Sequence, residues 1–574
     1  MPNGLATADY IILAGFFVVM LAIGFYFARR MRDLRDFFSG GRVVPWWISG
    51  VSLFMTTFSA YAFVGYSATA YKDGFVAIFL WWIVAGTFIV SAWFLASRWR
   101  RAATTSPVEF IERRYGAFLR QGFAWIGVPL IVIDDALKLY VIGTMVAGSL
   151  GFDNPAALPI AVAVCGVIIL AYTFLGGLWA VLITDFVQFV VLAAAVLVLA
   201  PLVIAKVGGP AGFFTNMPEN TWTFTSEAWP PGALVAFTVV LLLANCAKWP
   251  VVQRYYAVRT DREARRVGYL VAALLLIGMP VVLLPALGAR IFMPDVEDAN
   301  LVYSLVCRSL LPVGMLGMII AAMFSATMSM LSSDYNAVAS VITNDIYKRL
   351  TRRSPSDKAL VFAGRLTTFG VGLTALAIAL VLAVQPGEPD LVKVMAKLFG
   401  VLLPPTAIPM IFGLLTRRAS NTGAVSAFLT GALLGVAAYF LSFLDAWAFL
   451  GTLTWLTAIT AVPTLVVLLL LSALLPDRAE KRGHVDKFLD GLAGPEEVLP
   501  TDAAPGAEHF ATAMALRVIG SAGLGMGALL MLAVLVPLFS RGEGGTSLVT
   551  GLVLLAMGVG ALLLARRVQR RATA

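Results

Sequence analysis

Charged residues are scarce in this sequence. Asp, Glu, Lys and Arg make up 13% of its 574 residues, whereas hydrophobic residues make up 60%. Soluble globular proteins contain about 25% charged and about 45–50% apolar residues. Together with a mean hydropathy of +0.88, this composition excludes an ordinary soluble protein and predicts an integral membrane protein.

Histidine and cysteine are also rare. The two histidines, His484 and His509, lie outside the apolar segments, which argues against a zinc or haem site. Cys165, Cys246 and Cys307 lie in or beside apolar segments and form no CxxC pattern. The sequence therefore predicts neither a disulfide framework nor a cysteine metal site.

Motifs for nucleotide chemistry are absent. The sequence contains no GxxxxGK[ST] phosphate-binding loop, and no polar stretch is long enough for a kinase or a nucleotide-binding domain. We therefore do not expect ATP-driven transport by this chain alone. No nucleophile–base pair or metal cluster stands out, so we expect no enzyme activity and no organic cofactor.

Long apolar runs, in contrast, are abundant. A spanning helix needs about 20 apolar residues. Fifteen segments qualify, near 9–28, 46–70, 76–97, 121–149, 156–175, 178–204, 232–252, 267–290, 313–340, 360–384, 391–415, 423–443, 450–474, 512–538 and 546–566.

The basic residues predict how these spans are oriented. If the N-terminus lies outside, the inner loops hold about 31 of the 42 Lys and Arg residues and the outer loops about five. This asymmetry predicts a multi-pass protein of the cell inner (plasma) membrane, with its N-terminus outside and its C-terminus in the cytoplasm. The net charge of +10 is then a topology signal, and we expect no nucleic-acid partner.

Two of the predicted spans contain residues that interrupt a helix. The second contains "SLFMTTFSAYAFVGYS" (52–67), and the seventh contains "LLLANCAKWPVVQRYY" (241–256). The second to sixth and seventh to eleventh spans therefore predict two five-helix repeats, which have opposite orientations because five is odd. Paired interrupted helices in matching repeat positions point to the binding site of a transporter.

This pattern predicts five parts of the chain. They are a leading transmembrane helix with an inner loop (1–45), a transport core (46–415, with repeats at about 46–204 and 232–415), two trailing helices (416–475), a polar inner loop (476–511) and two C-terminal helices (512–574).

Hydroxyl groups are concentrated in the ninth span, which contains "AAMFSATMSMLSSDY" (321–335). At helical spacing, Ala326, Ser329 and Ser333 share one face, with Ser332 beside them. Hydroxyls and free backbone carbonyls are suitable ligands for a hard monovalent cation. Alternatively, these hydroxyls bond to carbonyls one turn away or let helices pack closely.

Charged residues inside spans are the other candidates, because they are costly there and are often functional. Asp185 lies in the sixth span, where it either takes part in a site, caps a helix or pairs with arginine. In the fourth span, Asp134 and Lys138 are four residues apart and are expected to neutralise each other, with Asp135 pointing elsewhere. These charges and Lys248 indicate either a substrate cavity or a buried structural pair.

At these motifs the sequence resembles the solute:sodium symporter family, which includes bacterial proline, sugar and sialic-acid transporters. The resemblance is carried by "DFFSGGRVVPWWISGVSLFMTTFSAYAFVG", "YTFLGGLWAVLITDFVQ", "VVQRYYAVRTDREARR" and "NAVASVITNDIYKR". It implies an all-α membrane protein of about 15 spans with a five-plus-five inverted-repeat core, one leading helix and several trailing helices. It also implies a secondary active symporter coupled to sodium.

The resemblance implies two sodium sites. The common one maps onto backbone and hydroxyl oxygens of Met55, Phe58, Ala326 and Ser329. Met330 stands where the family usually has Ser or Thr, and a thioether is a poor ligand for a hard cation, so we expect this site to be weakened, completed by water or displaced. A second site, found in some members, maps onto Asp185, Ser329, Ser332 and Ser333.

The candidate substrate-binding residues lie on the interrupted helices and the fourth span. They are Ser59, Tyr61, Ala62, Asp135, Lys138, Leu241, Asn245 and Lys248. Sugar-transporting members carry Gln, Asn and Tyr where this chain has Ala62, Leu241 and Ala244, so the charges favour an organic anion or a zwitterion. A sugar or polyol symporter, a proton-coupled carrier using Asp185 or Asp135, and a non-transporting membrane sensor are the alternatives. The expected partners are sodium, a small solute and the lipid bilayer.

Overall fold

The computed structural model describes residues 7–28, 42–102, 106, 108–150, 156–311, 315–348, 351, 356–385, 391–493, 507–535 and 545–573. Within these residues every regular element is a helix and none is a strand, which confirms the predicted all-helical class. Eleven of the described helices are long and apolar enough to span a membrane, or thirteen spans result if each of two bent helix pairs is one span. The count of fifteen and the inverted repeat stay predictions.

The elements follow one another in this order: α1 (Thr7–Ala28), α3 (Trp46–Thr56), η2 (Ala60–Ala62), α4 (Gly65–Asp73), α5 (Val76–Phe94), α6 (Ala96–Ala102), α7 (Glu109–Arg114), α8 (Ala117–Leu150), α9 (Ala157–Lys206), α10 (Gly209–Thr215), α11 (Pro231–Ala247), α12 (Trp249–Tyr256), α13 (Asp261–Phe292), η3 (Ala299–Leu301), α14 (Val302–Leu310), α15 (Met315–Val341), η4 (Ile342–Tyr347), α17 (Asp357–Val384), α18 (Leu391–Leu415), α19 (Asn421–Leu441), η5 (Asp445–Gly451), α20 (Leu453–Leu474), α21 (Ala479–Ala493), α22 (Ala507–Leu535) and α23 (Gly545–Thr573).

The first predicted interruption is the bend of 57° between α3 and the helix that begins at Ala60. Hydroxyl groups end α3, because Thr56 and Thr57 donate to the carbonyls of Ser52 and Phe54, each at 2.7 Å. Ser59 is extended, and its side chain accepts a hydrogen bond from Tyr61 N, so it caps the next turn. The backbone is therefore opened between 57 and 59, as the clustered hydroxyls predict.

The second predicted interruption is the bend of 43° between α11 and α12. Lys248 is extended, with φ −61° and ψ 133°, and stands directly before Trp249 and Pro250. Proline lacks a backbone N–H and is tolerated in the first turn of a helix, so a new helix begins here. Both bends therefore lie where the sequence places them.

One predicted boundary differs from the structure. The segments near 156–175 and 178–204 are expected to be separate spans. Both lie in α9, a helix of 50 residues, in which Leu178–Lys206 is long and apolar enough to span a membrane and Ala157–Ala171 is a shorter apolar stretch. The intervening Gly176 and Gly177 stay helical, because glycine weakens a helix without ending it as proline would.

The serine-rich helix α15 lies at the centre of the molecule. In its most apolar window, 89% of the residues are buried inside the protein, and it packs against α1, α3, α8, α9 and α17. The leading helix α1 supports its first turn, since Gly317 N donates to the Asp9 carboxylate at 2.7 Å. A Cβ at position 317 would lie 2.4 Å from the Asp9 carbonyl oxygen, so only glycine fits this contact.

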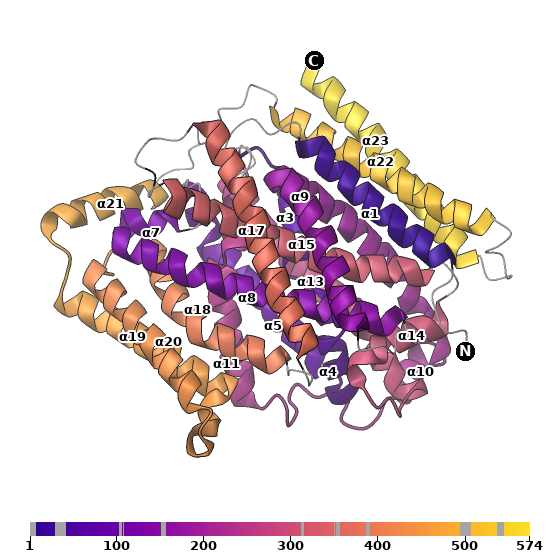
Figure 1. Ribbon diagram of the computed structural model, residues 1–574, viewed down its shortest axis with the longest axis horizontal. Helices are drawn as coiled ribbons and strands as arrows, with labels where there is room; N and C mark the ends of the chain where they lie inside the picture. The colour runs from indigo at the N-terminus through magenta and orange to yellow at the C-terminus, as the bar shows by residue number, and fades with distance from the viewer. Residues whose placement is uncertain are drawn as a thin grey trace.

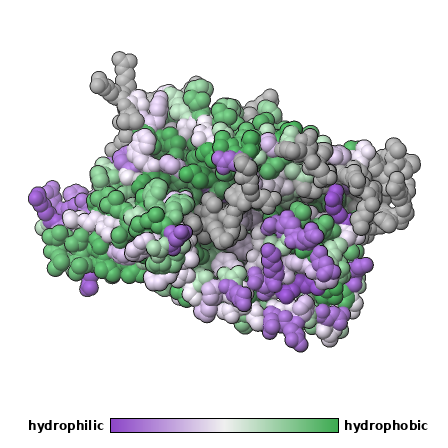
Figure 2. Space-filling model, turned by 60° about the horizontal axis from the view of Figure 1, so that its bottom comes forward, coloured by the Kyte–Doolittle hydropathy of each residue, from purple (hydrophilic) through white to green (hydrophobic). Residues whose placement is uncertain are grey.

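The remaining helices form the periphery of the molecule. The C-terminal pair α22 and α23 packs along α1 at one side (Figure 1), and the backbones of Gly520 and Gly558 approach so closely that a Cβ at 558 would lie 2.8 Å from the Gly520 carbonyl oxygen. The pair α19 and α20 lies at the other side, against α18 and α11. Figure 2 shows hydrophobic residues over much of the flank and hydrophilic residues gathered in one region of the visible face, as expected for a protein in a bilayer.

Candidate functional site

A cavity of about 250 Å³ lies between the two bent helix pairs and α8. Seven of the eight predicted substrate-binding residues line it: Ser59, Tyr61, Ala62, Lys138, Leu241, Asn245 and Lys248. The eighth, Asp135, lies behind Lys138 and binds its ammonium group at 2.8 Å. The structure thus brings together residues from three separate segments of the chain.

Aromatic rings form much of the cavity wall, and sequence reasoning did not identify them as site residues. Tyr66 and Trp81 lie against each other with ring centroids 4.8 Å apart, and both line the cavity. Phe399 lines it from α18, with Lys248 Nζ 5.8 Å from its ring centroid. Aromatic residues in apolar spans give no signal of their own, because they are equally common in ordinary helix packing.

The charged part of the wall is a buried cluster centred on Lys138. Its Nζ lies 2.7 Å from Asp134, 2.8 Å from Asp135 and 2.6 Å from Asp334. Lys248 is held more loosely, 3.9 Å from Asp134 and 4.0 Å from Asp334. Counting two ammonium groups and three carboxylates, the cluster carries a net charge of −1.

The predicted orientation of Asp135 is wrong. Asp134 pairs with Lys138 as expected, but Asp135 pairs with it too, because residues three apart on a helix are neighbours as much as residues four apart. Asp334 on α15 is a third partner from 196 residues away, which local spacing does not reveal. The three carboxylates lie within 4.8 Å of one another, as metal ligands would, but the lysine ammonium already binds all three.

One oxygen of each carboxylate in the cluster remains without a hydrogen bond. Among the described residues, Asp134 Oδ1, Asp135 Oδ2 and Asp334 Oδ1 are buried and accept from no donor. A buried, unpaired carboxylate oxygen is costly. Asp134 is the one of the three that also lines the cavity, where its side chain is 1% exposed.

Three of the four residues predicted for the second sodium site, Asp185, Ser329 and Ser333, lie close together. Asp185 on α9 accepts a short hydrogen bond from Ser52 Oγ on α3, and Ser329 is close enough to interact with the same carboxylate. Ser333 Oγ lies 3.1 Å from Thr56 Oγ1. Ser332 Oγ instead donates to the Ser329 carbonyl at 3.0 Å, which is the alternative that the sequence left open.

Arg254 on α12 lies in the middle of this group, and sequence reasoning missed it. Its guanidinium is fully buried, 3.6 Å from Asp185 Oδ2, and donates to Ser333 Oγ at 2.6 Å and to Ser52 Oγ at 3.0 Å. The motif "VVQRYY" was noted for its resemblance only. A signal was available, since an arginine close to a span needs an acid partner.

Two polar atoms of this group are buried and make no hydrogen bond to the described residues, namely Asp185 Oδ1 and Ser329 Oγ. Carboxylate and hydroxyl oxygens are the ligand types that a hard cation prefers. The residues present therefore fit a sodium ion, although the arginine already neutralises part of the charge.

The residues of the predicted common site lie at the end of α3 and on the facing side of α15. Met55 and Phe58 flank the bend, and Phe58 N donates to the Met55 carbonyl at 3.2 Å. Ala326 and Ser329 are fully buried on α15. Ala60 N donates to Thr327 Oγ1 at 3.0 Å, so the bend is attached to α15 next to these positions. Met330 lines the solute cavity.

The cavity extends toward the end of the molecule where α4 and α10 lie (Figure 1), since Thr69, Trp229 and Leu453 also line it. An ion-pair network joins α7, α8 and η4. Arg120 on α8 donates to Asp345 at 2.5 Å and pairs with Glu112.

Comparison with known proteins agrees with this geometry. A sodium/sialic acid symporter of Proteus mirabilis is 27% identical over 439 residues, covering 73% of this chain and 86% of the relative. A sodium/glucose cotransporter of Vibrio parahaemolyticus is 25% identical over 470 residues, covering 74% and 84%. Both are similar along most of their length.

Solved structures share the fold. A Na⁺-coupled sialic acid symporter in a substrate-bound outward-open state has a TM-score of 0.71 at 22% identity, covering 86% of this chain and all of that one. A nucleobase-cation-symport-1 family transporter has a TM-score of 0.53 at 13% identity, covering 79% and 98%. A sequence profile described as "Sodium:solute symporter family" matches residues 37–431. With most of its length matched and the expected motifs gathered at one site, the chain belongs to the sodium:solute symporter family.

Proposed function

We propose that this protein imports a zwitterionic organic solute together with sodium by alternating access. Membership of the family supports sodium-coupled symport of an organic solute, as do the sialic acid and glucose symporters among its relatives. The observation that carries the solute class is the buried cluster of two lysines and three aspartates in the cavity wall.

The two loosely satisfied groups of the cluster match the two charges of a zwitterion. Asp134 lines the cavity and keeps one oxygen without a donor, so it offers a place to an ammonium group. Lys248 lines the same cavity, is 17% exposed and lies 3.9 Å from its nearest carboxylate, so it is available to a carboxylate. The aromatic rings around them suit the apolar body of the solute and add a cation–π attraction for the ammonium.

Charge decides between the solute classes. With all five groups ionised the cluster carries −1, so a simple organic anion would add negative charge to a buried region where ions are poorly screened. A zwitterion leaves the total unchanged. A neutral sugar would bring no opposite charge to Asp134 or Lys248, and Ala62, Leu241 and Ala244 offer it no polar side chains. A zwitterion therefore fits better than an anion or a sugar.

Sodium would be held at two places on α15. The common site is proposed at Met55, Phe58, Ala326 and Ser329, and the second at Asp185, Ser329, Ser332 and Ser333. An ion bound there stabilises the contact of α15 with α3 and thus the arrangement in which the bend at residues 57–59 borders the cavity. Coupling requires that sodium and solute prefer the same conformation.

The number of sodium ions sets the gradient that the carrier sustains. One charge crossing ~100 mV contributes about 2.3 kcal/mol, and a tenfold sodium gradient adds about 1.4 kcal/mol. At about 3.7 kcal/mol per ion, one sodium supports roughly 500-fold accumulation of a solute without net charge, and two support roughly 10⁵-fold.

The proposed location is the cell inner membrane, with the N-terminus outside. The distribution of Lys and Arg supports this orientation, and it turns the part of the cavity near α4 and α10 to the outside. The arrangement is then that of an outward-facing carrier, ready to receive sodium and solute.

The decisive experiment is a thermal-shift screen of the purified protein with matched zwitterions, amines, carboxylates and sugars, each with sodium and with potassium. We expect the largest shift for a zwitterion in sodium. If a carboxylate or a sugar gave the largest thermal shift in sodium, the proposed solute class would be wrong, while the proposed coupling to sodium would still be supported. Uptake driven by a pH gradient without sodium would favour a proton-coupled carrier, and solute binding without flux in proteoliposomes would favour a sensor.

Two variants test the proposed contacts with the zwitterion. Asp134→Asn should lower the affinity for the zwitterion more than the affinity for the matching carboxylate, because it removes the partner of the ammonium group. Lys248→Gln should lower the affinity for the zwitterion more than the affinity for the matching amine, because it removes the partner of the carboxylate. We expect roughly tenfold losses, since a hydrogen bond to a charged group contributes about 1.5–3 kcal/mol. Equal losses for all ligands in both variants would show that neither residue distinguishes the two ends of the solute.

A further inference from the structure

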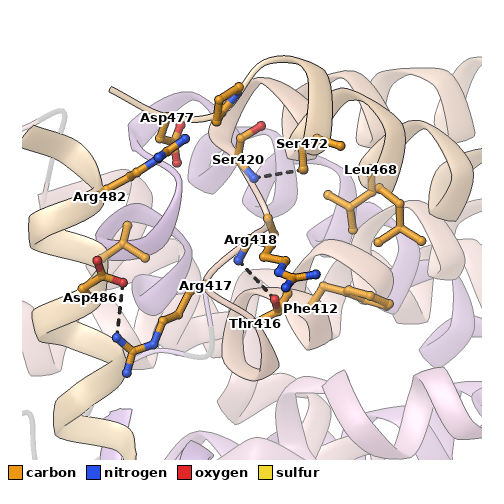
Figure 3. A pocket seen from close by; sticks show the side chains of 15 residues that line it. Phe412, Thr416, Arg417, Arg418, Ser420, Leu468, Ser472, Asp477, Arg482 and Asp486 are labelled. Atoms are coloured by element: carbon orange, nitrogen blue, oxygen red, sulfur yellow. Dashed lines mark hydrogen bonds and ion pairs between the residues drawn. The ribbon is translucent and has the colours of Figure 1, made fainter. Parts of the chain in front are cut away.

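A second pocket, of about 570 Å³, lies far from the solute cavity, between the α18–α19 turn, the end of α20 and α21 (Figure 3). Three of its charged residues already have partners. Arg417 pairs with Asp486 at 3.5 Å and with Asp490 at 2.5 Å, and Asp477 accepts from Asn421 N at 3.0 Å, at the first turn of α19. These interactions build the rim of the pocket.

Two arginines of the pocket have no acidic partner. Arg418 on the α18–α19 turn and Arg482 on α21 border the pocket from opposite walls (Figure 3), and neither guanidinium forms an ion pair with any residue that the structure describes. Both side chains are exposed to the pocket and solvent. Their positive charge is therefore available to an anion.

One wall of the pocket is apolar and leads to the bilayer. Leu468 and Leu469 are part of the membrane-spanning helix α20, and Leu469 is 50% exposed. Phe412 lines the same wall from α18. Two arginines without an ion pair to the described residues, next to an apolar wall at the end of a span, match a phospholipid, whose phosphate lies at the membrane surface and whose chains lie below it.

The wall formed by α21 is firmly attached to the protein. Lys481 Nζ donates to the Tyr115 carbonyl at 2.7 Å near one end of α21, and Arg101 donates to the Leu492 carbonyl at 3.0 Å at the other. With Arg417 bound to Asp490 between them, the helix holds Arg482 in a fixed position relative to α20.

We propose that this pocket binds an anionic phospholipid, with its phosphodiester between Arg418 and Arg482 and its acyl chains along Leu469. The site is independent of the solute cavity and of the sodium sites. A soluble phosphate compound would share the contacts with the arginines and leave the apolar wall in water, so the lipid is the better match.

The test uses the full-length protein, purified in detergent and stripped of lipid. Phosphatidylglycerol, phosphatidylcholine, glycerol 1-phosphate and inorganic phosphate are titrated separately, and bound ligand is counted by native mass spectrometry. We expect phosphatidylglycerol to bind more tightly than the other three. In the double variant Arg418→Gln/Arg482→Gln, its affinity should fall roughly thirtyfold, because each basic residue near an anionic lipid contributes about fivefold.

The matched control is Arg478→Gln, which removes the same charge from an exposed position of the same segment outside this pocket. It should change the affinity by less than about threefold through weak long-range attraction alone. Equal binding of phosphatidylglycerol and phosphatidylcholine would overturn the proposal, as would an unchanged double variant. Competition by glycerol 1-phosphate or inorganic phosphate at similar concentrations would assign the pocket to a soluble phosphate instead.

Discussion

At the scale of single residues, Lys138 balances most of the buried charge in the cavity wall. It is 1% exposed and touches three carboxylates at 2.6–2.8 Å. Without Lys138, the three carboxylates would be like charges buried close together in a region of low polarity. The residue that neutralises the site is thus also one that maintains the fold.

Replacing Lys138 with Met should therefore destabilise the protein strongly. Breaking a buried ion pair by removing one partner costs about 3–5 kcal/mol, and we expect a lowered midpoint in fluorescence-detected thermal unfolding. Lys248→Met is the control, because Lys248 lies no closer than 3.9 Å to an acid; it should lose solute binding with little loss of stability. A Lys138→Met protein as stable as wild type would contradict the ionic account of this cluster.

The proposed second sodium site gives another test. Asp185→Asn and Ser332→Ala should each raise the sodium concentration for half-maximal uptake, roughly tenfold for the aspartate because a charged ligand is lost. Ser340→Ala is the matched control, since among the described residues this buried hydroxyl on the same helix bonds to the Ala337 carbonyl alone. If Asp185→Asn and Ser332→Ala both match wild type, the second site is not used.

Several site residues could be predicted from the sequence. Polar groups such as Ser59, Lys138 and Lys248 are conspicuous in apolar spans, and the structure places them all on one cavity. The partners of Arg254 and Asp334 could not be assigned, because they are distant in the chain and only tertiary packing brings them together. Trp81 could not be assigned either, because an aromatic residue in a span looks the same in a cavity wall as in a helix interface.

At the scale of elements, the bend after α3 is stabilised by α15 and not by its own sequence alone. Ala60 N would otherwise be a free donor at a helix start, and it donates to Thr327 Oγ1 at 3.0 Å. The contact joins the opened backbone to the helix proposed to bind sodium, so the shape of one depends on the other.

Thr327→Val keeps the shape of the side chain and removes this acceptor. We expect a loss of about 1–3 kcal/mol of stability, because a buried N–H is left without a partner, and reduced sodium-dependent uptake. Thr184→Val is the control, since Thr184 donates only to carbonyls of its own helix. Equal thermal midpoints and uptake for Thr327→Val and Thr184→Val would show that the hydrogen bond to Ala60 is not important.

Helix interruptions differ in how far the sequence predicts them. Pro250 and the hydroxyls around Thr57 act on their own backbone, so both bends could be located in advance. The expected boundary between 175 and 178 rested on hydropathy and a glycine pair. Glycine leaves the choice of conformation to its surroundings, and here α9 remains helical.

At the scale of the whole molecule, the orientation in the membrane is open to direct measurement. The native cysteines Cys165, Cys246 and Cys307 are buried and should react little with a membrane-impermeant maleimide. Asp445→Cys, at the exposed turn between α19 and α20, should be labelled in intact cells. His484→Cys, on α21, should be labelled only after permeabilisation. The reverse pattern would contradict the proposed orientation.

The contact between Asp9 and Gly317 also has a consequence for biosynthesis. The partners are separated by 308 residues, which a ribosome adding about 5–20 residues per second needs about 15–60 s to make. The first helix therefore enters the bilayer well before Gly317, whose N–H donates to Asp9, has been synthesised. Nascent chains released before residue 317 lack the hydrogen bond between Asp9 and Gly317. Only after Gly317 has been synthesised can α1 attach to α15.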